Sequence, residues 1–167
     1  MMRWTSLALA VLALSAAAAD DEKLDDKTFV TKASASGLTE VNLGRLAEKQ
    51  ASSEAVKKFA KMTVEDHTKA NKELNKLADT KKFKVSERMT REQQELHDKL
   101  SKLDGAEFDR EYMAGQVKSH EQGVALFEKQ SKGGMDEGLK NFAEKTLPTL
   151  KMHLKMAKEI KDKLKGE

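Results

Sequence analysis

Apolar residues recur every three or four positions through most of this chain, which predicts a succession of long amphipathic helices. The pattern covers residues 26–49, resumes after Ala51-Ser52-Ser53, where a serine can cap a helix, and returns over 106–130 and 135–163. Gly133-Gly134 closes the third stretch, and Pro148 is expected to kink the fourth or shift its register. Four long helices are therefore expected, with no strands.

The region between the second and third helices, residues 86–103, has a thinner apolar stripe and is expected to form a connecting helix. A helix of roughly 17 residues extends about 25 Å, close to the length of a bundle. The predicted fold is therefore an all-α, antiparallel four-helix bundle of ferritin-like order, with an additional helix in the crossover. The first and last helix pairs look like two hairpins, but no repeat of fixed period is evident.

The N-terminus has the order of a secretory signal peptide: a basic start, an apolar stretch over 4–13, and small residues at Ala17 and Ala19. The apolar stretch is shorter than a membrane-spanning helix needs, so cleavage after about Ala19 is expected, with a retained anchor as the alternative. No cysteine is available for a lipid anchor. The predicted organisation is a signal peptide (1–19), a short flexible segment (20–27) and one domain (28–164), in the periplasm or secreted.

The composition narrows the class of partner. Cleavage would remove one Arg and no acid, leaving 148 residues with a formal charge of +2 instead of +3. Charged residues make up 35% of the chain and alternate in sign, without the basic stripe and exposed aromatics of a nucleic-acid binder. We expect no nucleic-acid partner, no stable membrane insertion after cleavage and no disulfide. The sequence identifies no protein partner.

Four residues on the apolar faces, one from each predicted long helix, are polar enough to need an explanation: Glu40, His67, His120 and His153. Facing helices of a bundle build metal sites from such residues, and imidazole with carboxylate suits zinc, iron, copper or manganese. Counting residues from the helix ends places Glu40, His67 and His120 level with one another. The same count places His153 about 10 Å away.

Four further residues are expected around these ligands. Asp109 and Tyr112 are predicted to lie beside His153, while Asp66 and Asn71 flank His67 on its own helix. The Glu-x-x-His pairs of ferritins are missing, because Val64, Val117 and Leu150 stand three residues before the histidines, so a di-iron centre is disfavoured. The alternative is a set of neutral core histidines that bond to neighbours such as Asn71 or Tyr112 and fix helix register without a ligand.

Four motifs resemble those of one family of exported bacterial proteins. They are Gly37-Leu38-Thr39-Glu40-Val41-Asn42-Leu43-Gly44, Val64-Glu65-Asp66-His67-Thr68-Lys69-Ala70-Asn71, Phe108-Asp109-Arg110-Glu111-Tyr112 and Leu147-Pro148-Thr149-Leu150-Lys151-Met152-His153. In this order, over about 28–157, they resemble the DUF4142 family. The resemblance implies a ferritin-like fold in the periplasm or at the cell envelope. It implies no reaction, because the family's function is unknown.

Three functional hypotheses remain at this point. The first is a non-enzymatic exported bundle that holds a metal ion in its interior. The second is a metal-dependent oxidoreductase or metal-storage protein that uses the same residues. The third is an envelope stress or interaction module without a ligand. No Ser-His-Asp order, Gly-rich phosphate loop or cysteine nucleophile supports a hydrolase or nucleotide-binding protein.

Overall fold

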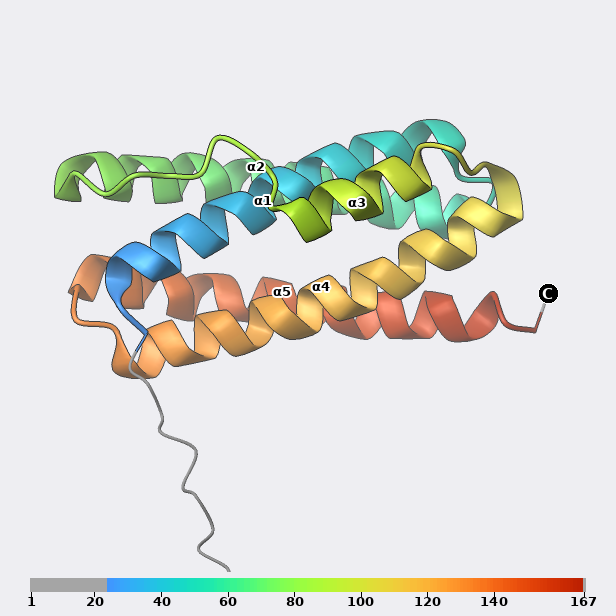
Figure 1. Cartoon of the computed structure of the whole chain (residues 1–167). Helices are drawn as coiled ribbons and strands as arrows, with labels where there is room; N and C mark the ends of the chain where they lie inside the picture. The colour runs from blue at the N-terminus through green and yellow to red at the C-terminus, as the bar shows by residue number, and fades with distance from the viewer. Residues whose placement is uncertain (1–23, 167) are drawn as a thin grey trace, which may run out of the picture.

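The computed structural model describes residues 24–166, and the predicted signal peptide lies outside them. The described chain is all-α (Figure 1). Its helices are α1 (Asp26–Gln50), α2 (Glu54–Lys81), α3 (Arg91–Leu100), α4 (Gly105–Gly133) and α5 (Glu137–Lys163). The four long helices match the predicted stretches closely, and α5 runs without a break through Pro148. No helix among the described residues is long and apolar enough to cross a membrane.

The helices form two antiparallel hairpins, α1 with α2 and α4 with α5, packed side by side (Figure 1). α1 lies against α4, and α2 lies against α5. Because α2 and α4 begin at the same end of the bundle, the chain must return along its whole length between them. The predicted antiparallel bundle with a long crossover is therefore confirmed.

The crossover is only partly helical, which differs from the helix expected over 86–103. α2 ends at Lys81, where the C-cap residue Lys82 has a left-handed φ of 56°, and the next residues run without helix along α1. There the backbone N–H of Ser86 donates to Ser34 Oγ at 2.7 Å. Thr90 and Gln93 then form a reciprocal capping box, which starts α3 at Arg91. The capping box sets the start of this helix later than the apolar stripe suggested.

The two hairpins are repeats of each other at a spacing of 83 residues, which the sequence pattern had not revealed. α1 ends at Gln50 and α4 at Gly133, while α2 begins at Glu54 and α5 at Glu137. Identical residues at this spacing include Asp26 and Asp109, Val41 and Val124, Leu43 and Leu126, Glu54 and Glu137, Phe59 and Phe142, Ala60 and Ala143, and Thr63 and Thr146. Most of these types are common in any helical bundle, so they stood out only once the helices were aligned.

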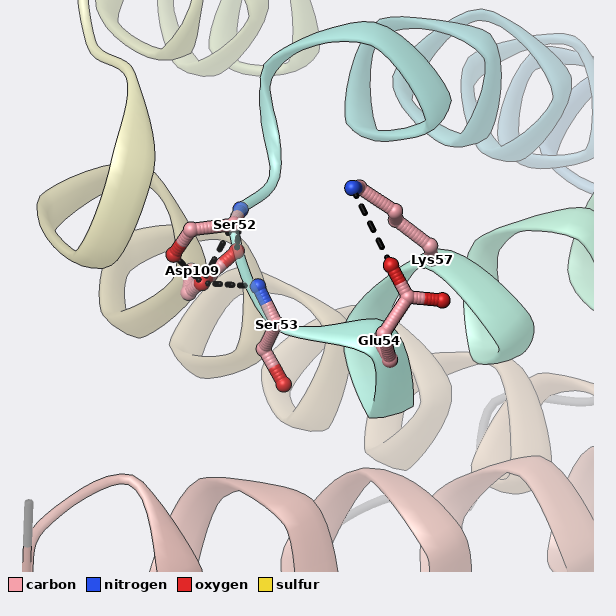
Figure 2. Close-up of polar contacts among 5 residues, drawn as sticks. All are labelled: Ser52, Ser53, Glu54, Lys57 and Asp109. Carbon is pink, nitrogen blue, oxygen red and sulfur yellow. Dashed lines mark hydrogen bonds and ion pairs between the residues drawn. The ribbon is translucent and has the colours of Figure 1, made fainter.

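A buried aspartate from each hairpin holds the loop of the other. Asp109, on α4, accepts hydrogen bonds from the backbone N–H groups of Ser52 and Ser53 and from the Ser52 hydroxyl (Figure 2). The Ser53 side chain makes no capping bond of its own, so the expected serine cap is replaced by a carboxylate from another helix. Asp109 is only 1% exposed, and its negative charge faces the N-terminus of α2.

Asp26 has the matching role at the opposite end of the bundle. Its carboxylate accepts from the backbone N–H groups of Met135 and Asp136 and from the Gln130 side chain, at 2.7 to 3.2 Å. These contacts join the start of α1 to the loop before α5. The segment expected before the domain, 20–27, thus includes a buried residue that fixes the second hairpin.

Candidate metal centre

Three histidines from three helices meet inside the bundle. They are His67 on α2, His120 on α4 and His153 on α5, and one ring nitrogen of each lies within 4.8 Å of the other two. Their ring centroids are 5.3 to 5.7 Å apart. The Phe59 ring packs edge-on against His120 and His153, with centroids 6.2 and 6.1 Å away, and closes the site on one side.

The predicted separation of His153 from the other two histidines is wrong. Nδ1 of His153 lies 3.3 Å from Nε2 of His120. Counting from Gly133 assumed that α5 begins level with the end of α4. Instead, the non-helical residues 134–136 separate the end of α4 from the start of α5 at Glu137, and the contact between the two rings places His153 level with His120.

The hydrogen-bond partners of two histidines decide where their protons lie. His120 Nδ1 is 3.0 Å from the Gln116 carbonyl oxygen, and His153 Nε2 is 3.1 Å from Asp66 Oδ2. Both partners are acceptors when Asp66 is ionised, so each of these two nitrogens must carry the proton. A neutral imidazole has only one proton. When both rings are neutral, His120 Nε2 and His153 Nδ1 therefore face each other with bare lone pairs, and no proton is left for a hydrogen bond between them.

His67 adds an unpartnered nitrogen beside this pair. Its Nε2 is buried and has no hydrogen-bond partner among the described residues. Burial, together with the other two histidines, holds the pKa of His67 well below its usual range. Burial and His120 also lower the pKa of His153, against the opposing effect of Asp66. Neutral imidazole is the form that binds a metal ion.

Glu40 lies near the histidines but outside their group. Its Oε2 accepts from Gln116 Nε2 at 2.8 Å, and the residue is 4% exposed. Glu40, His67 and His120 all line one cavity of about 40 Å³, which has room for a small ligand or water. Of the four ligands expected from the sequence, the structure brings the three histidines together and leaves Glu40 across this cavity.

The other residues expected around the site have separate positions. Asp66 contacts His153, whereas Asp109 holds the α1–α2 loop instead of a histidine. Tyr112 stacks on Phe108 at a centroid distance of 5.5 Å, and its hydroxyl has no partner among the described residues. Burial, with Glu40 adding to the effect, raises the pKa of Tyr112 well above its usual range. Asn71 lines the cavity and packs closely against Gly37.

Two residues that sequence reasoning did not single out complete the site. Gln116 is fully buried, bonds Glu40 with its side chain and accepts from His120 with its backbone. Its position one turn before His120, on the same apolar face, was a usable signal. Phe59 looked like ordinary core. Its contact with two histidines depends on how α2, α4 and α5 pack, which the periodicity of one helix does not show.

Comparisons with solved structures support the fold. A protein from Streptomyces coelicolor, described as "putative secreted protein DUF305", has a TM-score of 0.71 at 14% identity, covering 83% of this chain and 91% of that one. CopM in its Cu(II)-bound form has a TM-score of 0.72 at 16% identity, covering 84% of this chain and 98% of that one. At these identities the likeness shows a shared helical-bundle fold. No curated protein is significantly similar to this sequence.

The sequence itself matches one family profile, described as a domain of unknown function, DUF4142. The match extends over residues 11–160 and thus includes the five helices almost completely, with all three clustered histidines. The chain therefore belongs to the DUF4142 family.

Proposed function

We propose that this protein is an exported, non-enzymatic metal-binding bundle that holds one transition-metal ion between His67, His120 and His153. The observation that carries the proposal is the convergence of three imidazoles: the outer partners of His120 and His153 leave their facing nitrogens free to bind a metal ion, and the buried Nε2 of His67 has no hydrogen-bond partner among the described residues. In a network built only for stability, the 3.3 Å contact between His120 and His153 would need a proton that two neutral rings do not have.

The distances also suit a metal ion. Metal–nitrogen bonds of about 2.0–2.1 Å at a tetrahedral angle place two ligand nitrogens about 3.3 Å apart, which is the observed spacing of His120 Nε2 and His153 Nδ1. The carboxylate of Asp66 behind His153 and the carbonyl of Gln116 behind His120 are the outer partners that metal-binding histidines usually have. Three histidines leave a fourth coordination position for another ligand.

Copper is the ion we place first. Imidazole ligands suit zinc, copper, iron and nickel, and among divalent ions copper binds such sites most tightly. The Cu(II)-bound form of CopM, which has a similar fold, supports this choice. A three-nitrogen site without a thiolate or thioether also accepts zinc, so the experiment should offer both ions.

The test is metal binding by untagged residues 20–167, measured by equilibrium dialysis against Cu(II) and Zn(II). We expect one ion per chain, and loss of that ion in His67→Leu and His153→Ala. The opposite hairpin has Leu150 and Ala70 at the equivalent positions, so these replacements suit a bundle interior. His97→Gln, on the crossover helix and outside the group of three, is the matched control.

Two results would reject the proposal: wild-type protein without a tightly bound ion, or binding that survives both histidine substitutions. If His67→Leu lowers thermal stability while wild-type protein binds no metal, the cluster is a buried polar network only.

A further inference from the structure

The cavity beside the histidines and a groove on the molecular surface share part of their walls. The inner cavity contacts His67 and His120. The groove, about 620 Å³, lies between α1, α3 and α4. Four residues line both spaces: Ser36 and Glu40 on α1, and Ser119 and Gly123 on α4. We call these four residues the port, because they are the boundary between solvent and the cavity.

The port is polar where the rest of the cavity is largely apolar. Three of its four residues have a side chain that carries oxygen. The other residues that line the cavity include Leu74, Phe127 and Phe142. Glu40 is the one carboxylate among the described residues that line both spaces, and its only hydrogen bond in the described chain comes from the neutral amide of Gln116. One neutral hydrogen bond offsets little of the cost of burying a carboxylate. A cation beside Glu40 is therefore favoured.

The crossover helix covers the outer side of the port. Gln93 on α3 donates to Ser36 Oγ at 3.5 Å, and Glu92 pairs with Lys118 of α4 at 2.7 Å. Leu96 packs on Gly115, where an added Cβ would come within 3.2 Å of it. These contacts hold α3 over the seam between α1 and α4 while leaving the groove beneath it open.

A second route by which a metal ion could approach the histidines runs past Asp66, on the side of the bundle formed by α2 and α5. The Asp66 side chain is 30% exposed and reaches the cluster at His153 Nε2. That nitrogen carries the proton and lies on the opposite side of the imidazole ring from the bare Nδ1. An ion at Asp66 would thus be separated from the facing nitrogens of the three histidines by the ring of His153.

We infer that metal ions reach the three histidines through the port, and that the Glu40 carboxylate binds the ion in transit without being a final ligand. This inference rests on the proposed function, since it concerns loading of the same centre. Under this inference the groove beneath α3 is the path of metal entry and Glu40 is a transient binding site, whereas the final centre consists of the three histidines alone.

Two substitutions test the port. Gly123→Leu places an apolar side chain in the opening, and a Cβ at this position meets no atom within 4 Å, so helix α4 should tolerate it. Glu40→Gln removes the negative charge but keeps an oxygen that accepts from Gln116. The matched control is Gly133→Leu, at the far end of the same helix, where an added Cβ also meets nothing within 4 Å. Gly123→Ala controls for loss of glycine without filling the opening.

Tyr112 reports on loading. It is the only tyrosine in the sequence, and the single tryptophan, Trp4, lies in the predicted signal peptide. The Tyr112 ring packs against Phe59, which contacts His120 and His153, so a Cu(II) ion at the histidines should quench its fluorescence. Stopped-flow mixing of residues 20–167 with Cu(II) gives the loading rate, and mixing of loaded protein with a strong chelator gives the release rate.

We expect Gly123→Leu and Glu40→Gln to slow loading and release alike, each by about tenfold or more, the effect of raising a barrier by about 1.4 kcal/mol. Affinity at equilibrium should then stay within about twofold, since both rates change together. Gly133→Leu and Gly123→Ala should load at the wild-type rate. Circular dichroism and urea midpoints confirm that each variant is folded.

Wild-type loading rates in both port variants would overturn the inference while leaving the proposed function intact. A loss of affinity in Glu40→Gln without slower loading would also overturn it, because Glu40 would then be a final ligand. Failure of the wild-type chain to bind Cu(II) or Zn(II) would instead reject the proposed function, and this inference with it.

Discussion

At the scale of single residues, the protonation of three imidazoles decides what the centre can do. Asp66 and the Gln116 carbonyl each require an N–H from a histidine, and this turns the bare nitrogens of those rings toward His67. Burial favours the neutral form of His67 and His153. Under the proposed function, the metal-free site already holds its imidazoles in the form that binds a cation.

This protonation predicts how the stability of the metal-free protein depends on pH. The ordinary pKa of histidine is 6.5, and the folded chain holds that of His67 well below it. As pH falls below 6.5, the unfolded chain binds protons that the folded chain does not, so the free energy of unfolding decreases. Urea unfolding of chelator-treated protein between pH 7.5 and 5.5 should show this decrease. His67→Leu should make the slope shallower, and an unchanged slope would contradict the low pKa.

The sequence predicted which histidines lie in the bundle interior better than it predicted their geometry. Their place on apolar faces was enough to single out His67, His120 and His153. Their common height was not, because residues 134–136 are not helical, and no helical periodicity encodes where α5 then begins along the bundle axis. The partner of Asp109 was misjudged for the same reason, since its contact with Ser52 and Ser53 depends on how the two hairpins dock.

At the scale of helices, each hairpin loop depends on a carboxylate from the other hairpin. Asp109 satisfies the N–H groups of Ser52 and Ser53, and Asp26 satisfies those of Met135 and Asp136. Glu54 pairs with Lys57 in the first turn of α2 (Figure 2), and Glu137 pairs with Lys140 at the equivalent place in α5. Surface pairs of this kind contribute little, so we attribute the docking of the loops to the two aspartates.

Removing one of these carboxylates should weaken the whole bundle. Asp109→Ala leaves two backbone N–H groups without their acceptor, and we expect it to lower the free energy of unfolding by about 1–3 kcal/mol. The equivalent change, Asp26→Ala, should have an effect of similar size. Urea denaturation followed by circular dichroism measures both, with Asp79→Asn, an exposed position on α2, as the control. A change below about 0.5 kcal/mol for Asp109→Ala would show that the loop does not need this contact.

At the scale of the molecule, the two hairpins repeat each other in their helices and loops, but the three histidines of the candidate metal centre are not repeated. The positions equivalent to His67, His120 and His153 are Leu150, Gly37 and Ala70, and all three of these line the inner cavity. The three histidines thus have no counterparts in the repeat, and two of the equivalent residues, Gly37 and Ala70, are small and line the cavity beside them. The long crossover, needed to place α4 antiparallel to α1, also covers the groove that leads to this space.

The most direct test of the central claim is X-ray absorption spectroscopy of residues 20–167 loaded with one equivalent of Cu(II). Our account predicts scattering from three imidazole rings with metal–nitrogen distances of about 2.0 Å. His153→Ala should lose one ring from that signal. A first shell of oxygen ligands with no imidazole scattering, or a spectrum unchanged by His153→Ala, would contradict the account.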